Sequence, residues 1–182
     1  NGVVAGGRFE CSITATIDVR GGIGIRAGTT SAIHSAVAAG SQLTVLGNVK
    51  AGSASSAYGI YHMNSGNLVV TGDVAGGTAA STRGIDVGTG SVNITGNVTG
   101  GSGSWAVGIS AGMGNVSITG NVTGGPGGNA QGVSNGPGTV TITGNVTGGP
   151  NSGAYGVYNT SGTATITGDV FNGTGYGVWN DT

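Results

Sequence analysis

Charged side chains are scarce in this sequence, and their scarcity excludes several classes of partner. Asp, Glu, Lys and Arg make up 6% of the 182 residues, and five basic against six acidic residues leave a formal net charge of −1. The basic residues stand singly, so the chain lacks the electrostatic footprint that nucleic acid or an anionic membrane would require. No apolar stretch reaches the roughly 18 residues of a membrane span. We therefore expect neither a nucleic-acid partner nor a membrane-spanning segment.

Cysteine and histidine are also few. The single cysteine, Cys11, cannot form an internal disulfide. His34 and His62 have no Cys or carboxylate at ligand spacing, so we predict no metal site and no cofactor, and we expect both histidines to be exposed turn residues. Glycine is abundant instead, with 43 residues. Abundant glycine with low charge can indicate disorder, but Val and Ile recur at fixed positions, which indicates a regular fold.

An internal repeat accounts for most of the sequence. The segment T-x-T-G-N-V-T-G-G returns almost unchanged, and its central glycine recurs at steps of 25, 24, 24, 24 and 24 residues. These glycines are Gly47, Gly72, Gly96, Gly120, Gly144 and Gly168. A second column of glycines, each followed by Ile or Val, keeps the same period from Gly84 to Gly156. A shared period in separate columns is the signature of a repeat architecture.

The apolar residues of each repeat alternate, as in a strand with one buried face. Val or Ile residues flank the central glycine, and we expect Val98, Val122 and Val146 to stack in one buried column. Glycine and β-branched residues at this density oppose a helical repeat. One repeat cannot bury its apolar groups alone, whereas stacked coils form a continuous core. The sequence therefore predicts an all-β fold, a single parallel β-solenoid (β-helix) of about six to seven coils of about 24 residues.

The repeat is irregular at its N-terminal end. We predict that residues 1–42 form a degenerate N-terminal coil with an inserted loop or cap around Ala27–Gly40, in which Ala32–Ala39 is a short helix or a capping loop. The strand core of that coil is expected to consist of Ile13, Ala15, Ile17 and Val19. Residues 43–182 are predicted to be regular repeats that end in mid-coil. Because an open solenoid end exposes unpaired strand edges, we expect further coils of a longer chain, or copies of the protein, to cover it.

We expect the strand alternation to continue through the central glycine, so that columns of Thr and Asn point outward as a flat grid. Coils lie about 4.7–4.9 Å apart and alternate side chains of a strand about 6.6–6.8 Å apart. The candidate binding face consists of Thr71, Thr95, Thr119, Thr143, Thr167, Asn97, Asn121, Asn145, Thr99, Thr123 and Thr147. Such ladders can satisfy one another within the fold, or they can bind an ordered ligand such as ice or a crystalline polysaccharide.

Aromatic residues mark the second strand of some coils, among them Tyr58 and Tyr61. The candidate aromatic contact patch consists of Tyr155, Tyr158, Tyr176 and Trp179. If the glycine between two such positions marks a bulge, both side chains face outward. Outward rings can stack on sugar rings, or they can bury against a neighbouring coil or a partner chain.

The carboxylates are spread too widely for the common hydrolytic chemistry. Glycoside hydrolysis uses two carboxyl groups about 5–9.5 Å apart. Asp73 and Asp169 share a column, but they stand four coils apart, roughly 19 Å at strand spacing. We therefore predict no catalytic residues, and we expect that the chain is not an enzyme.

The repeat T-I-T-G-N-V-T-G-G, with A-x-G-[IV] in the following arc, resembles the parallel β-helix repeats of bacterial surface and adhesin-like proteins and the shafts of some phage fibres. The resemblance covers about residues 43–180. It implies secretion, surface display and attachment, and thus an extracellular location or one at a cell or virion surface. The T-x-T element is also similar to ice-binding β-solenoids, although Val69, Asn93 and Ser117 interrupt the outer column.

Three functions follow as hypotheses. The first is a non-catalytic structural or adhesive segment of an extracellular appendage or fibre, self-assembling and in contact with glycans. The alternative is an ice-binding protein that uses the Thr and Asn face. The third is a polysaccharide-acting β-helix, for which the sequence supplies no acidic cleft.

Overall fold

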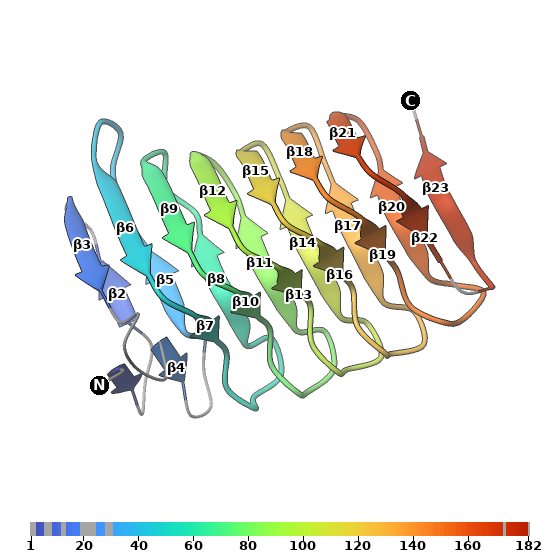
Figure 1. Cartoon of the computed structure of the whole chain (residues 1–182), viewed down its shortest axis with the longest axis horizontal. Coiled ribbons are helices and arrows are strands. Elements are labelled where there is room, and N and C mark those ends of the chain that lie inside the picture. Colours follow the sequence, from blue (N-terminus) through green and yellow to red (C-terminus); the bar gives the residue numbers. More distant parts are fainter. Residues whose placement is uncertain are drawn as a thin grey trace.

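The chain folds into a β-solenoid with three parallel sheets. A computed structural model describes residues 3–5, 9–11, 14–18, 25–27, 31–172 and 174–181, and within these ranges every regular element is a strand. Equivalent residues of neighbouring coils pair in register, as Val74 does with Val98. The coils stack along the long axis from the N-terminal to the C-terminal end (Figure 1). The predicted all-β parallel solenoid with coils about 24 residues apart is confirmed.

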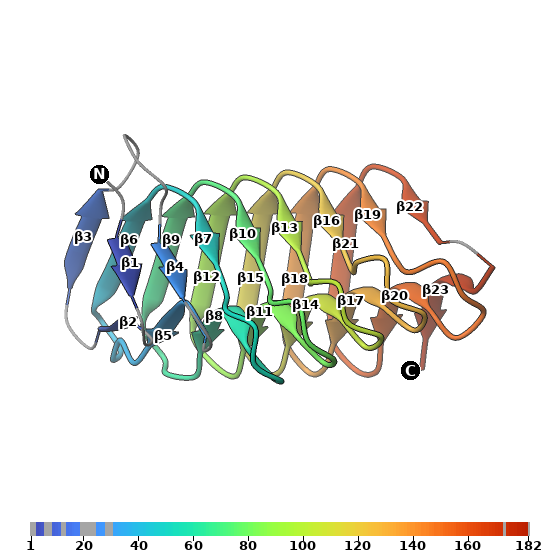
Figure 2. The same cartoon turned by 90° about the horizontal axis from the view of Figure 1, so that it is seen from below.

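Each regular coil runs through the sheets in the order C, A, B. Sheet A consists of β1 (Val3–Ala5), β4 (Ile25–Ala27), β7 (Val49–Lys50), β10 (Val74–Ala75), β13 (Val98–Thr99), β16 (Val122–Thr123), β19 (Val146–Thr147) and β22 (Val170–Phe171). Sheet B consists of β2 (Phe9–Cys11), β5 (Ile33–Ser35), β8 (Tyr58–His62), β11 (Arg83–Val87), β14 (Val107–Ala111), β17 (Gln131–Asn135), β20 (Tyr155–Asn159) and β23 (Tyr176–Asn180). Sheet C consists of β3 (Ala15–Asp18), β6 (Gln42–Leu46), β9 (Asn67–Thr71), β12 (Ser91–Thr95), β15 (Asn115–Thr119), β18 (Thr139–Thr143) and β21 (Thr163–Thr167). Figure 2 shows the short strands of sheet A and the loops that lead from them to sheet B.

The three sheets enclose one core of aliphatic columns. Val98, Val122 and Val146 pair in sequence along sheet A and are fully buried, which confirms the predicted column. Ile and Val from sheets B and C complete the core, for example Ile109 and Ile118. Each fully buried Val or Ile contributes about 1.5–3 kcal/mol relative to an exposed position. Coil stacking therefore supplies the stability that a single coil lacks.

Glycine at two positions of the coil is required by the backbone. Gly120 ends the sheet C strand with a φ of 147°, a conformation that favours glycine, and a Cβ there would collide with the Gly96 carbonyl of the preceding coil. In sheet B, a Cβ on Gly108 would lie 2.5 Å from the Gly132 oxygen and 2.7 Å from a Val122 methyl carbon. The first glycine turns the chain from sheet C to sheet A, and the second lets sheet B approach sheet A.

The N-terminal region continues the same three sheets. The expectation of a short helix or capping loop at Ala32–Ala39 is wrong, because Ile33–Ser35 forms β5 and pairs with β8. The alanines of this segment favour a helix locally, but stacking of Ile33 against Ile60 in the core overrides that weak propensity. In β3, the two expected core residues lie opposite Leu43 and Val45 of β6. These two are Ala15 and Ile17, whereas Ile13 and Val19 lie outside the described residues.

The core is open at the last coil. Val178 of β23 is 58% exposed, whereas Val157, its partner in β20, is buried. A recess of about 470 Å³ lies between β20, β21 and β23 and is lined partly by Val157, Ile166 and Val178. Apolar core atoms are therefore accessible at this end of the stack.

Candidate binding faces

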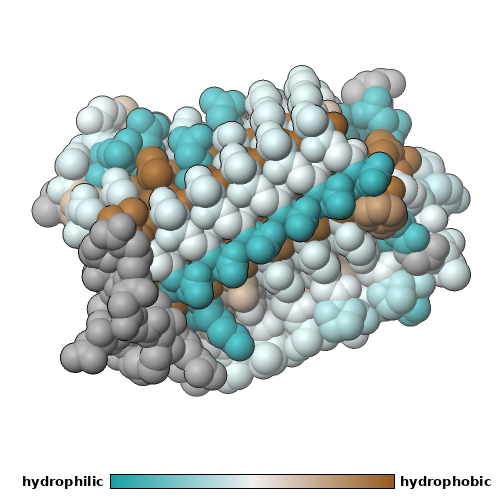
Figure 3. Space-filling model, viewed as in Figure 1, coloured by the Kyte–Doolittle hydropathy of each residue, from teal (hydrophilic) through white to brown (hydrophobic). Residues whose placement is uncertain are grey.

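A ladder of Asn and Asp residues runs along the corner between sheets C and A. The Oδ1 of each ladder residue before the last accepts a hydrogen bond of 2.8 or 2.9 Å from the backbone N–H of the equivalent residue in the next coil. The ladder consists of Asn48, Asp73, Asn97, Asn121, Asn145 and Asp169. It is the teal stripe across the face shown in Figure 3. These side chains are exposed, but their oxygens already serve the stacking of the coils.

The ladder divides the predicted Thr and Asn grid between two sheets. The prediction continued the strand alternation through the central glycine, but the positive φ of residues such as Gly96 ends sheet C there. The sheet C part of the grid is Thr71, Thr95, Thr119, Thr143 and Thr167. The sheet A part is Thr99, Thr123 and Thr147. The expectation of one continuous strand face is therefore wrong, and each set of threonines belongs to its own sheet.

The outward hydroxyl groups of sheet C are available to solvent. The five sheet C strands from β9 to β21 each end in an exposed threonine, from Thr71 to Thr167. The hydroxyls of these threonines make no hydrogen bond with any residue that the structure describes. Thr141 and Thr165 extend this surface in the last two coils, whereas Val69 and Asn93 occupy the same column in earlier ones. Unlike the asparagines, these threonines are not used by the coil stacking.

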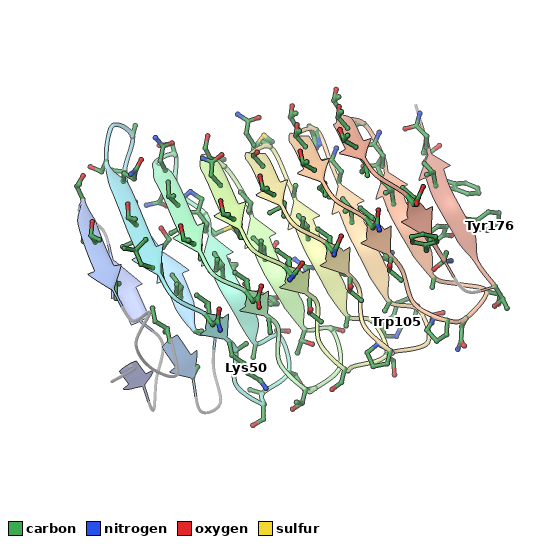
Figure 4. The ribbon with its side chains drawn as sticks, viewed as in Figure 1. Lys50, Trp105 and Tyr176 are labelled. Carbon is green, nitrogen blue, oxygen red and sulfur yellow. The ribbon has the colours of Figure 1, made fainter. Side chains whose placement is uncertain are left out.

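The four residues of the candidate aromatic patch lie together on the outer face of sheet B. Tyr155 pairs with Tyr176, and Tyr158 pairs with Trp179, across the last two strands. The rings of Tyr155 and Tyr176 stack at 5.7 Å with an interplanar angle of 12°, and Trp179 meets Tyr176 edge-on at 5.4 Å. Tyr176 is 54% and Trp179 is 40% exposed. Figure 4 shows Tyr176 projecting at the C-terminal end of the stack.

A second aromatic cluster lies on the same face near the N-terminal end. Tyr61 of β8 contacts Tyr58 at 5.6 Å and His34 of β5 at 5.0 Å, between ring centroids. Arg83 of β11 places its guanidinium carbon 5.4 Å from the Tyr58 ring centre and binds Asp86 at 2.7 Å. The sequence prediction named the two tyrosines but not their contacts with His34 and Arg83 of the neighbouring coils. The signal was present in the register, since His34, Tyr61 and Asp86 follow one another in a single column.

A column of polar side chains is buried behind sheet B. His62 is fully buried, so its expected place in an exposed turn is wrong, and His34 too lies in a strand. Burial lowers the pKa of His62 below its usual value, while a hydrogen bond between Nε2 and the Gly66 carbonyl acts in the opposite direction. Farther along, Asn135 donates to Asn159 at 2.7 Å. His62 and Asn135 are fully buried, so we assign them to the core, whereas Asn159 also lines the recess at the last coil.

The part of the chain that the structure describes holds no cluster of metal-ligating side chains. Within those ranges, no three His, Cys, Asp or Glu side chains gather closely enough to hold a metal ion. Asp73 belongs to the ladder and Asp86 is paired with Arg83, while the side chains of Glu10 and Asp18 lie outside the described set. The same residues include no helix of the length and apolarity needed to cross a membrane.

Comparisons with known proteins add no relative to this picture. No protein-family model, no curated protein and no solved structure matches the chain.

Proposed function

We propose that the chain is a non-catalytic adhesive segment of an extracellular appendage or fibre, and that it contacts glycans through its C-terminal aromatic patch. The observation that supports this proposal is the grouping of Tyr155, Tyr158, Tyr176 and Trp179 on one outer face, with two of the rings about half exposed. Tyr and Trp combine a large apolar ring with a polar tip, which suits a ligand that has both apolar and hydroxyl surfaces. A sugar ring is such a ligand.

The stacked strands add rigidity to this patch. Tyr155 and Tyr176 lie on neighbouring strands whose register is set by the sheet. The distance between the two rings is therefore already fixed before a ligand binds. Preorganised contacts lose less conformational entropy on binding. The surface location is part of the same proposal and rests on the resemblance of the repeat to surface β-helix proteins.

Binding to immobilised neutral oligosaccharides (cellohexaose, maltohexaose and mannohexaose) tests the adhesive role. Tyr176→Ala with Trp179→Ala is expected to weaken binding at least about tenfold, because Trp and Tyr anchors commonly contribute more than 1 kcal/mol each. Trp105→Ala is the matched control, since Trp105 is 57% exposed but lies on a loop, away from the patch (Figure 4). Equal binding by the double variant and the control variant would contradict the proposal.

Ice binding is the second candidate, and a separate observation favours it. The Thr71 to Thr167 column presents exposed hydroxyls that have no partner in the described chain, so they are available to order water. We expect Thr119→Tyr, which projects from the middle of sheet C, to abolish any ice shaping and non-colligative freezing depression of the parent chain. Thr123→Tyr on sheet A is the control and should leave both effects intact. Normal ice growth in the presence of the parent chain would exclude this function.

A further inference from the structure

A recess on the outer face of sheet B has the dimensions of a small-ligand site. It has a volume of about 410 Å³ and lies between β5, β8, β11 and the loop of residues 54–57. Tyr58, Tyr61, His34 and Asp86 line it together with Ser31 and the small residues of that loop. Small-molecule sites commonly have volumes of about 300–1,000 Å³ and combine apolar walls with a few polar groups.

The aromatic walls of the recess are held at fixed angles. The Tyr58 and Tyr61 rings are tilted by 32° at 5.6 Å, and His34 meets Tyr61 at 62°. These three side chains are half-buried, so their positions are constrained while part of each ring stays accessible. Such walls suit the apolar CH face of a ring-shaped ligand.

The carboxylate that lines the recess, that of Asp86, is neutralised by Arg83 of the same strand. Arg83 Nη1 lies 2.7 Å from Asp86 Oδ2, and the Asp86 side chain is only 11% exposed. Arg83 also lies over one face of the Tyr58 ring, with its guanidinium carbon 5.4 Å from the ring centre. The second carboxylate oxygen, Oδ1 of Asp86, accepts no hydrogen bond from the residues that the structure describes. An ionic ligand would have to break the pair, whereas a hydroxyl group can donate to Oδ1 and leave the pair intact.

We propose that this recess binds a neutral hexose unit of a glycan, as a second sugar site in addition to the C-terminal aromatic patch. The proposal rests on the glycan-binding function proposed above and gives it a ligand class, uncharged and rich in hydroxyl groups. Tyr58 and Tyr61 contact the apolar face of the sugar, and Asp86 Oδ1 accepts from its hydroxyls. Arg83 orients the carboxylate and makes the site electrically neutral.

The register places both sugar sites along one line. Tyr61 pairs with Asp86, and the same column continues through Ser110 and Ser134 to Tyr158. Tyr61 and Tyr158 are therefore four coils apart, about 19 Å at a strand spacing of about 4.7–4.9 Å. A glycan chain that follows the solenoid axis can reach both sites, and engagement of one site raises the effective concentration at the other. Long oligomers should consequently bind more tightly per chain than short ones.

Isothermal titration of the full chain with cellobiose, cellohexaose, mannohexaose and hexagalacturonate tests the site. We expect neutral hexasaccharides to bind, hexagalacturonate to bind more weakly, and Tyr61→Ala to weaken neutral binding about tenfold. Tyr61→Phe keeps the ring and should retain most of the affinity, and it keeps the test valid if the alanine variant fails to fold. Trp105→Ala should bind as the parent chain does.

Asp86→Asn gives a readout that a purely structural role would not produce. This change frees the Arg83 guanidinium and leaves the recess with a net positive charge, so the preference should move from the neutral hexasaccharides to hexagalacturonate. Asp73→Asn is the matched control, because it removes one carboxylate from the ladder, where Asn97 and Asn121 occupy equivalent positions. It should leave the preference unchanged.

The outcomes separate the two proposals. If the Tyr61 and Asp86 variants bind like the parent chain while Tyr176→Ala with Trp179→Ala loses binding, the second site is refuted and the patch stands. If only the Tyr61 and Asp86 variants change, the second site stands and the role of the patch is refuted. If the parent chain binds none of the four sugars, both are refuted.

Discussion

The inward orientation of the valine columns leads to the sharpest stability prediction. In Val122→Asp, a carboxylate would replace a fully buried side chain whose neighbours in the column, Val98 and Val146, are also fully buried. The change forfeits about 1.5–3 kcal/mol of apolar burial. An unpaired buried charge costs several kcal/mol more, about 3–5 when a partner is missing. Domains are stable by about 5–15 kcal/mol in total, so we expect this variant to be unfolded or aggregated near neutral pH.

Thr123→Asp is the control, because the next residue of the same strand points outward and is half-buried. Size-exclusion chromatography should show that Thr123→Asp is soluble. Circular dichroism should show that it unfolds cooperatively, at a melting temperature within a few degrees of that of the parent chain. Acidification supplies a second check, since protonation of the carboxylate introduced by Val122→Asp would remove the charge and recover part of the folded population. A soluble Val122→Asp chain with the melting temperature of the parent would refute the inward assignment of sheet A.

Three further predictions concern sheet contact, pH and assembly. Gly108→Ala should lower the melting temperature by the equivalent of about 2 kcal/mol or more. The added Cβ would lie 2.5 Å from the Gly132 oxygen and 2.7 Å from a Val122 methyl carbon. A parent-like melting curve would contradict the close approach of sheets A and B. Because the pKa of His62 is lowered in the folded chain, the unfolded chain binds a proton more readily at this residue. The free energy of unfolding should therefore be highest above about pH 6.5 and fall below that pH. Thermal melts at several pH values should show a weaker pH dependence for His62→Asn. We propose that the exposed apolar groups of β23 pair with a second copy of the chain, so sedimentation should show concentration-dependent association that Val178→Asp suppresses. A parent chain that stays monomeric at all concentrations would count against this pairing.

The repeat period was sufficient to predict most of the fold. Equivalent residues spaced by 24, such as Val98 and Val122, had to align once the coils were assumed to stack, and the register follows directly. The two residues on either side of the Gly84–Ile85 pair in sheet B lie on the same side of the strand, as predicted, since Arg83 and Asp86 form an ion pair across it. These features could be predicted because they depend on local spacing repeated many times.

The predictions for the Thr and Asn grid and for His62 were wrong because the same local sequence pattern fits two different structures. Alternation of polar and apolar residues is the same on both sides of Gly96, and only the positive φ of that glycine separates sheet C from sheet A. The sequence predicts His62 in an exposed turn, yet it pairs with Val87 in an inward column. Alignment of equivalent positions in neighbouring coils places His62 beside the apolar Val87, and it places Tyr61 between His34 and Asp86.

The columns of the solenoid differ in how much they vary, and this difference indicates where a ligand can be specified. From Asn48 to Asp169, the corner between sheets C and A carries Asn or Asp in every coil, because such a side chain can accept from the backbone N–H of the next coil, as Asn121 does from Asn145. A change there would remove a stacking hydrogen bond. The outer columns of sheet B meet no such requirement, and neighbouring coils carry Tyr61, Asp86 and Ser110 at one position. Side chains that the stacking does not constrain can vary to fit a ligand, so recognition by this chain is expected on sheet B rather than along the ladder.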